Sequence, residues 1–262
     1  MAYCEHGAAA NPVLLYIHGN TGSKLWFERV MDVPGYRVIA PDMPNFGDSE
    51  HIDTADIDVY ADYVAEFMQA LGIQNAYVVG HSLGGAVSIS LVVRYPKLVG
   101  RLLLVDPAPL EGLHTPQEYY PVIESYKENP GMLKEALRAV TPTLDDEAFL
   151  DRLTDSAVKM NKMAYTGNPR ALDRFDYRGR VDEVRIPVLL VRGELDGLIT
   201  EDLGRNTVES FPAGEFRSLE GVGHAVMVED PPRFLDFFLD YTATAEIYTL
   251  WHTLARPAAL RI

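Results

Sequence analysis

The sequence contains only one cysteine, Cys4, among its 262 residues. A single thiol excludes a disulfide within the chain and fits a reducing compartment. Long apolar runs are also missing, since none approaches the length of a membrane-spanning segment. The chain does not open with a charged and then apolar leader followed by a small-residue cleavage site. We therefore expect a soluble, cytoplasmic protein with no membrane insertion.

Basic residues are few, because 23 lysines and arginines stand against 38 aspartates and glutamates, for a formal charge of -15. Such a surface repels phosphate backbones and anionic lipid heads, which argues against nucleic-acid binding. Much of the acidic excess lies in residues 53–58 and 144–151. Neither segment has the spacing of a calcium loop, so we interpret both as a solvated acidic face and expect no metal site.

Short β-branched runs alternate with longer helical patterns, which is typical of a parallel sheet covered by helices. The predicted strands are Val13–His18, Tyr36–Ala40, Ala76–Gly80, Arg101–Asp106, Val188–Gly193 and Glu215–Leu219. The predicted helices between them are Tyr60–Leu71, Leu83–Tyr95, Asp202–Ser210 and Pro231–Asp240. The strands lack strict alternation and are therefore expected to be buried on both faces. We predict an α/β fold with a mostly parallel, doubly wound sheet and a site at the carboxyl ends of its strands.

Between residues 107 and 180 the alternation stops, and proline and glycine breaks separate several helices. Those helices are predicted at Gln117–Glu128, Met132–Val140, Asp145–Met163 and after Pro169. We interpret this segment as a helical cap inserted into a core formed by residues 1–106 and 181–245. Its tyrosines and methionines are candidates for an apolar pocket, although most are expected to pack the cap against itself. They are Tyr119, Tyr120, Tyr126, Met160, Met163 and Tyr165.

Residues 246–262 form a C-terminal extension. Apolar residues recur in it at helical spacing: Ile247, Leu250, Trp251 and Leu254. This spacing predicts a short amphipathic helix that ends before Pro257. The helix has two candidate docking surfaces, the domain itself or a second subunit of a homodimer, and a tail left by cloning is a third interpretation.

The motif GHSLGG, residues 80–85, follows a predicted strand and precedes a helix. A dinucleotide-binding fingerprint has this outline, but it needs a glycine where this chain has Ser82, because the pyrophosphate must approach bare backbone. The segment HGNTGSK, residues 18–24, is too short for a phosphate-binding Walker loop. A nucleotide cofactor is therefore not expected.

The same motif fits a nucleophilic serine on a sharp turn. Ser82 stands between Gly80 and Gly84 in the pattern G-x-S-x-G, and small neighbours let the strand and the helix pass closely. The helix that begins at Leu83 would direct its N-terminal amides toward the space beside the hydroxyl. The placement between strand and helix makes Ser82 the candidate nucleophile.

A serine hydroxyl needs a neutral imidazole to take its proton. Of the seven histidines, His224 lies on a glycine-flanked loop between the last predicted strand and the last predicted helix. This loop belongs to the same sheet edge as Ser82. His18 is interpreted as structural and His81 is expected to point away from Ser82, while the others lack a motif or lie in the cap or the tail.

The imidazole in turn needs an acceptor for its other nitrogen. Asp196 follows a predicted strand by a few residues, and the chain order serine, aspartate, histidine favours it. Its rivals are Glu194, which is expected in the turn itself, and Asp106, at the end of an earlier strand. Asp106 stays open as the alternative acid.

An oxyanion intermediate needs two backbone donors. The amide of Leu83 follows the nucleophile, and the second donor is expected from the loop after the first predicted strand, where Asn20 is the candidate. Asn20 is also explained as an ordinary turn residue, since Asn-Thr-Gly is common in turns.

With these residues placed, the chain resembles the α/β-hydrolase superfamily from about Tyr3 to Tyr241. The matching segments are HGN at His18, YRVIAPDMPNFGDS at 36–49, VVGHSLGG at 78–85, RIPVLLVRGELD at 185–196 and GVGHAVMVEDP at 221–231. The resemblance implies an eight-stranded, mostly parallel sheet, a helical cap, and Ser82, Asp196 and His224 as a catalytic triad. One departure is that the chain begins almost at the family's second strand.

Within the superfamily, HGN followed by PDMPNFGDS resembles haloalkane dehalogenases and epoxide hydrolases, which attack with an aspartate in the place of Ser82. Serine implies the esterase-like branches instead. We expect an esterase that cleaves a small to medium apolar ester through an acyl-enzyme, with no cofactor. The alternatives are a carbon-carbon bond hydrolase or a cofactor-free perhydrolase with the same triad, or a non-catalytic ligand receptor on this fold.

Overall fold

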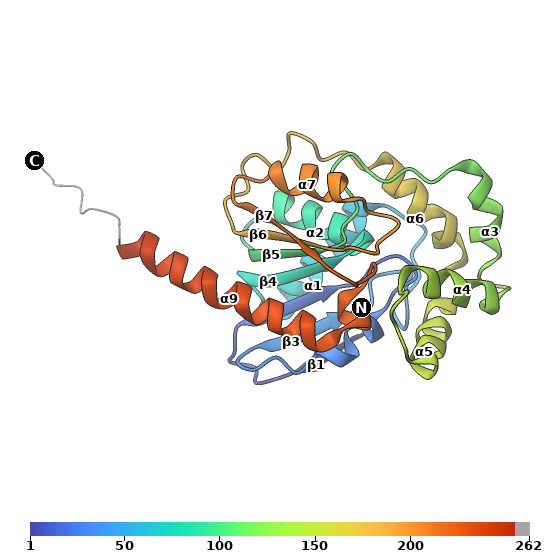
Figure 1. Ribbon diagram of the computed structural model, residues 1–262, viewed down its shortest axis with the longest axis horizontal. Coiled ribbons are helices and arrows are strands. Elements are labelled where there is room, and N and C mark those ends of the chain that lie inside the picture. Colours follow the sequence, from blue (N-terminus) through green and yellow to red (C-terminus); the bar gives the residue numbers. More distant parts are fainter. Residues whose placement is uncertain (255–262) are drawn as a thin grey trace, which may run out of the picture.

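A seven-stranded sheet organises the chain in the computed structural model, which describes the backbone of residues 1–254 and side chains through Thr242 (Figure 1). The strands are β1 (Tyr3–His6), β2 (Val13–Ile17), β3 (Arg37–Pro41), β4 (Ala76–His81), β5 (Val99–Val105), β6 (Val188–Gly193) and β7 (Gly214–Leu219). Their order is β1-β3-β2-β4-β5-β6-β7, and every neighbouring pair is parallel except β1 with β3. The predicted α/β fold with a mostly parallel sheet is confirmed.

Two details of the sheet differ from expectation. The resemblance implied eight strands, whereas the sheet has seven, and its antiparallel edge strand β1 was not predicted. β1 is only four residues long and mostly exposed, so it lacks the apolar run that marks the inner strands. Its register comes from pairing with β3, where Cys4 lies opposite Ala40.

Helices cover both faces of the sheet. The core helices are η1 (Lys24–Val30), α1 (Ile57–Ala70), α2 (Leu83–Arg94), α7 (Glu201–Glu209), α8 (Val226–Glu229) and α9 (Pro231–Leu254). Side chains alternate between the two faces along β4, so Gly80 and Tyr77 lie on opposite faces. Gly80 lies against Ser88 of α2, and Tyr77 contacts Phe238 of α9. This double cover explains why the inner strands are continuous apolar runs.

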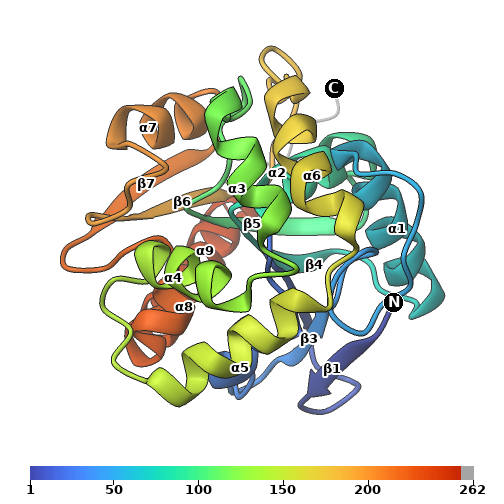
Figure 2. The same cartoon turned by 90° about the vertical axis from the view of Figure 1, so that its right-hand side faces the viewer.

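Between β5 and β6 the chain forms a layer of short helices: η2 (Gln117–Tyr119), α3 (Tyr120–Ser125), α4 (Pro130–Val140), α5 (Glu147–Val158) and α6 (Lys162–Arg174). Figure 2 shows these helices in front of the sheet, on the side opposite the projecting end of α9. The helix predicted over Asp145–Met163 is wrong, because Asn161 caps a new helix by accepting a hydrogen bond from the amide of Met163. Pro169 lies inside that helix rather than before it.

The long helix α9 contains both the predicted helix at Pro231 and residues 247–254 of the predicted extension. Its first turns pack on the sheet, where Phe234 contacts Tyr16. Residues 255–262 lie outside the described part of the chain, and so do the side chains of the proposed amphipathic face. Within the described residues, no helix has both the length and the hydropathy needed to cross a membrane.

The strand order fixes where a ligand can reach the sheet. The chain leaves β2 for β3 on one side and returns to β4 on the other, so the connections after β2 and β4 diverge from adjacent strands. Such a divergence opens a crevice at the carboxyl ends of the strands. Ser82 follows β4 at this point, and Asn20 follows β2.

Candidate active site

Ser82 occupies a strained turn between β4 and α2. Its backbone has φ 53° and ψ -119°, a conformation that a non-glycine residue adopts at a cost. Its flanking glycines are required by close packing: a Cβ on Gly80 would lie 2.3 Å from Ser88 Oγ, and one on Gly84 would lie 2.3 Å from the Ile17 carbonyl oxygen. The Ser82 hydroxyl does not cap α2, which leaves it available to the space above the turn.

His224 and Asp196 form a buried hydrogen-bonded pair. His224 Nδ1 lies 2.7 Å from Asp196 Oδ2, and the side chains are 5% and 0% exposed. Backbone contacts hold both partners, because the amide of Leu198 donates to Asp196 Oδ1 at 2.7 Å and the amide of His224 donates to the Val140 carbonyl at 3.0 Å. Burial opposes ionisation of Asp196, but its contacts with His224 outweigh burial and lower the pKa of the carboxyl to about 2.

A cavity of about 240 Å³ brings Ser82, His224 and Asn20 to one surface. The helical layer between β5 and β6 supplies most of its apolar wall: Leu113, Ile123, Tyr126, Leu133, Leu137 and Leu172. Of the six candidate tyrosines and methionines, only Tyr126 lines this cavity within the described residues. Tyr120, Met160 and Tyr165 are buried, whereas Tyr119 and Met163 are exposed, so the expectation that most of the six pack inside the cap holds for three of them.

The described contacts do not include a hydrogen bond between the side chains of Ser82 and His224, although both line the cavity. Hydrogen bonds of this kind are often long or poorly aligned before substrate binds. The structure therefore brings the predicted base and acid into direct contact and places the predicted nucleophile beside them.

The loop after β2 passes directly against the serine turn. A Cβ on Gly19 would lie 2.9 Å from the Cβ of Ser82, so only glycine lets the two backbones approach this closely. Leu83 is the first residue of α2, where backbone amides have no acceptor within the helix. Anions are stabilised at such a helix N-terminus. Asn20 and Leu83 thus lie on the two segments that flank Ser82.

A buried amide ties the Asn20 loop to the cap. Asn168 of α6 donates to Asn20 Oδ1 at 2.9 Å and accepts from the Tyr60 hydroxyl at 2.9 Å. Asn168 is fully buried, so its removal takes away the acceptor for the Tyr60 hydroxyl proton and the donor to Asn20 at a site that water does not reach. Sequence analysis missed Asn168, because no local pattern distinguishes it from a helix-surface asparagine.

We expect Asn168→Ala to destabilise the protein by about 1–3 kcal/mol, since the buried Tyr60 hydroxyl loses its acceptor and Asn20 loses its donor. The free energy of unfolding from urea titration measures this loss. Asn206→Ala, at an exposed position on α7, is the matched control and should change stability by less than about 0.5 kcal/mol. Equal stability of the two variants would contradict the bridging role of Asn168.

Two other histidines near the site have clear positions. The structural interpretation of His18 agrees with its burial and with its Nε2, which accepts from the Met43 amide at 3.0 Å. The expectation that His81 points away from the site is wrong, because its side chain lines the cavity and its Nε2 lies 3.0 Å from the His224 carbonyl oxygen. Burial lowers the pKa of His81 well below its usual value, with the nearby His224 adding to the effect. A neutral His81 therefore supports the backbone of the His224 loop.

One group in the described chain has the composition of a metal site. Asp106, Asp196 and His224 offer ligand atoms within 4.8 Å of one another. Three of the four carboxylate oxygens already accept hydrogen bonds, from Gly193, Leu198 and His224. A metal ion here would have to replace the hydrogen bond between Asp196 and His224.

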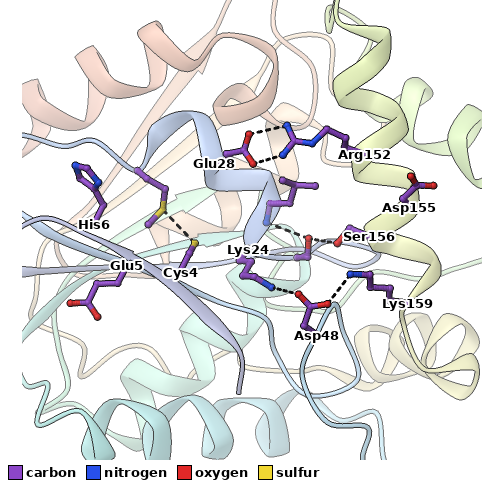
Figure 3. Close-up of a pocket in the computed structure, with 13 residues that line it drawn as sticks. Cys4, Glu5, His6, Lys24, Glu28, Asp48, Arg152, Asp155, Ser156 and Lys159 are labelled. Carbon is purple, nitrogen blue, oxygen red and sulfur yellow. Dashed lines mark hydrogen bonds and ion pairs between the residues drawn. The ribbon is translucent and has the colours of Figure 1, made fainter.

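A larger cavity of about 490 Å³ lies between β1, η1 and α5 (Figure 3). Three ion pairs lie among its lining residues: Arg152 with Glu28, and both Lys24 and Lys159 with Asp48. Hydrogen bonds from Lys159 and Lys24 lower the pKa of Asp48 to about 2. These ion pairs join α5 to the core, and the nucleophile candidate Ser82 is not part of this cavity.

Comparison with known proteins agrees with the fold described above. Residues 12–154 match the model of the alpha/beta hydrolase fold family. Over 263 aligned positions the chain is 29% identical to a 2-hydroxy-6-oxononadienedioate/2-hydroxy-6-oxononatrienedioate hydrolase of Paraburkholderia phymatum, covering 91% of this chain and 89% of that protein. It is also 29% identical to Lipase 3 of a Moraxella species, covering 87% of this chain and 76% of the lipase.

Among solved structures, an esterase from Exiguobacterium antarcticum superposes with a TM-score of 0.81 at 19% identity, covering 91% of this chain and 94% of that one. The likeness at this identity concerns the fold. The family model covers more than half of the chain, and the mostly parallel sheet agrees with that match. The chain therefore belongs to the alpha/beta hydrolase fold family.

Proposed function

We propose that this protein is a serine hydrolase that cleaves carboxylic esters of small to medium apolar substrates through an acyl-enzyme. The observation that carries the proposal is the hydrogen-bonded His224–Asp196 pair in one cavity with a serine on a strained turn. A serine and an imidazole oriented by a carboxylate form the constellation of acyl transfer.

In the proposed reaction, Ser82 Oγ attacks the ester carbonyl carbon while His224 Nε2 takes the hydroxyl proton. Asp196 holds Nδ1–H and stabilises the imidazolium. The carbonyl oxygen becomes negative and accepts hydrogen bonds from the amides of Leu83 and Asn20. The C–O bond to the alcohol then breaks, and the alcohol leaves with the proton from His224. Water, deprotonated by His224, then attacks the acyl carbon. The bond from this carbon to Ser82 Oγ breaks, the acid leaves, and His224 returns the proton to Ser82 Oγ.

The lining of the cavity supports an uncharged substrate. The wall is mostly aliphatic and aromatic, and no lysine or arginine is among its lining residues in the described chain. A dicarboxylate would bury its charges there without a cationic partner, at a high cost in free energy. The Paraburkholderia relative carries a dioate in its name, so this observation favours ester cleavage over carbon-carbon cleavage of such a substrate here.

Labelling with a fluorophosphonate probe tests the proposal. We expect the purified protein to form one covalent adduct, and Ser82→Ala to form none. Ser210→Ala, on the α7 end far along the chain, is the control and should label like the parent. The absence of any adduct would favour the ligand-receptor alternative, and an adduct that persisted in Ser82→Ala would exclude Ser82 as nucleophile.

Substrate comparison separates the reactions that share a triad. We expect kcat/KM to be highest for hydrolysis of short-chain nitrophenyl esters. Cleavage of a vinylogous diketone, and formation of a peracid from a carboxylic acid and peroxide, should both be slower. Preferential cleavage of the diketone would favour a carbon-carbon hydrolase, and preferential peracid formation would favour a perhydrolase.

A further inference from the structure

Two carboxyl groups lie side by side beneath His224. Asp106 follows β5 and is fully buried, and Asp196 follows β6 and is 6% exposed. β5 and β6 are neighbouring parallel strands, which is why their carboxyl ends bring the two side chains together. One oxygen of each carboxyl group and one ring nitrogen of His224 lie within 4.8 Å of one another.

A count of hydrogen-bond donors leaves one buried oxygen of this carboxyl pair without a partner. Asp196 uses Oδ1 to accept from the Leu198 amide and Oδ2 to accept from His224. Asp106 Oδ1 accepts from the Gly193 amide at 3.0 Å. Asp106 Oδ2 is buried, and no donor from the described residues faces it. Two ionised carboxylates at this separation would repel each other and leave that oxygen unpaired.

The charged and titratable groups around the pair do not remove this conflict. Arg192 of β6 lies nearby, but its guanidinium donates to the backbone carbonyls of Ile199 and Asp196 and to neither carboxyl group. His224 already donates to Asp196, and His81 contacts the His224 backbone. A proton on Asp106 itself satisfies both oxygens.

We propose that Asp106 is a positioning residue that stays protonated at neutral pH and donates a hydrogen bond from its Oδ2–H to Asp196. This bond fixes the carboxylate that orients His224, and its catalytic consequence rests on the proposed function. Burial, followed by the nearby charge of Asp196, raises the pKa of the Asp106 carboxyl well above its usual range. The contact with Asp106 also helps to lower the pKa of Asp196. Asp106 is therefore a support for the acid and not a second acid.

The substitution Asp106→Asn distinguishes a protonated Asp106 from an ionised Asp106. An asparagine amide accepts from Gly193 with its oxygen and donates to Asp196 with its nitrogen, so it reproduces both contacts without a titrating proton. Asparagine also tolerates the left-handed backbone at this position, where φ is 42°. Asp106→Ala removes the donor altogether.

For hydrolysis of a nitrophenyl ester, we expect Asp106→Asn to keep kcat within about threefold of the parent, with the acid limb of the pH profile unmoved. Asp106→Ala should lose about tenfold or more in kcat with little change in KM, because a hydrogen bond to a charged group is lost. A loss in Asp106→Asn as large as in Asp106→Ala would overturn the proposal. A shift of its acid limb to lower pH would do the same, since it would show that a negative charge had been removed beside His224.

Infrared difference spectroscopy reads the proton directly and needs no turnover. At neutral pH, the spectrum of the parent minus that of Asp106→Asn should contain the C=O stretching band of a protonated carboxylic acid. A spectrum without this band would overturn the proposal whatever the kinetics. If the band is present but Ser82 does not react with fluorophosphonate, Asp106 is protonated and its role in catalysis is overturned. Failure of the proposed function is thereby distinguished from failure of the proposal about Asp106.

Discussion

Replacing His224 with alanine is expected to lower kcat for an ester substrate by about a millionfold, the size of loss found when the base of a serine protease triad is removed. Without the His224 imidazole, the described residues that line the cavity include no other group held by a carboxylate that could take the Ser82 hydroxyl proton. His81 is the nearest other ring, with its centroid 4.9 Å from that of His224, but its Nε2 is engaged by the His224 carbonyl. KM should change little, because His224 does not hold the apolar part of the substrate.

A graded series makes this expectation specific. Asp196→Asn should lower kcat by about 10⁴, because the amide offers a donor where the imidazole needs an acceptor. His114→Ala is the matched control: this histidine is exposed on the cap and pairs with Asp173, so kcat should stay within about twofold. Steady-state kinetics on a nitrophenyl ester measure all three variants. A kcat for His224→Ala within tenfold of the parent would exclude His224 as the base.

The parts of the site that were predictable from sequence depend on strand ends. Ser82 follows β4, whose apolar run is clear, whereas His224 follows the edge strand β7, which is largely polar and exposed. Parallel strands deliver their carboxyl ends to one edge of the sheet, which is why both residues could be placed there. The predicted contact between Asp196 and His224 is present at 2.7 Å. The roles of these residues in catalysis stay a prediction.

What sequence could not supply is the packing between segments far apart in the chain. Asp106 and Asp196 were treated as competitors, because a linear pattern does not show that β5 and β6 are neighbours and that both carboxyl groups lie near one imidazole. His81 was expected to point away from Ser82 because the two residues are adjacent on a sharp turn. The sequence does not show that the ring of His81 contacts His224, which lies on a distant loop. Asn168 had no signal at all, since its partners Asn20 and Tyr60 lie more than one hundred positions away.

The same limit applies to the cap. Its helical character follows from local periodicity, but the break at Asn161 depends on a contact with the core, where the Asn161 amide donates to the Asn45 carbonyl at 2.8 Å. The cavity wall depends on how those helices sit over Ser82, which residue composition does not determine. The lining and volume of the cavity are therefore the properties for which the structure adds most to the sequence.

The second large effect is expected from Gly193→Ala, at the end of β6. A Cβ at this position would lie 1.8 Å from the Gly223 carbonyl oxygen and 2.5 Å from that of Val222, so the backbone of the loop before His224 must move. Overpacking against backbone costs about 3 kcal/mol or more, and the midpoint of thermal unfolding should fall by about 6 °C or more. Because His224 directly follows Gly223, the displacement should also lower kcat by about a hundredfold at temperatures where the variant is folded.

Gly197→Ala is the matched control for this experiment, because it makes the same change four positions later, in the connection from β6 to α7. A Cβ on Gly197 meets no atom within 4 Å, so the unfolding midpoint should stay within about 2 °C of the parent. Thermal unfolding followed by circular dichroism, together with kcat measured well below the midpoint, checks both variants. If Gly193→Ala unfolds and turns over substrate like Gly197→Ala, the close approach of β6 to the His224 loop does not constrain the base. A lower unfolding midpoint with an unchanged kcat would show instead that the loop relaxes without moving the imidazole of His224. The close approach at Gly193 would then matter for stability and not for the geometry of the site.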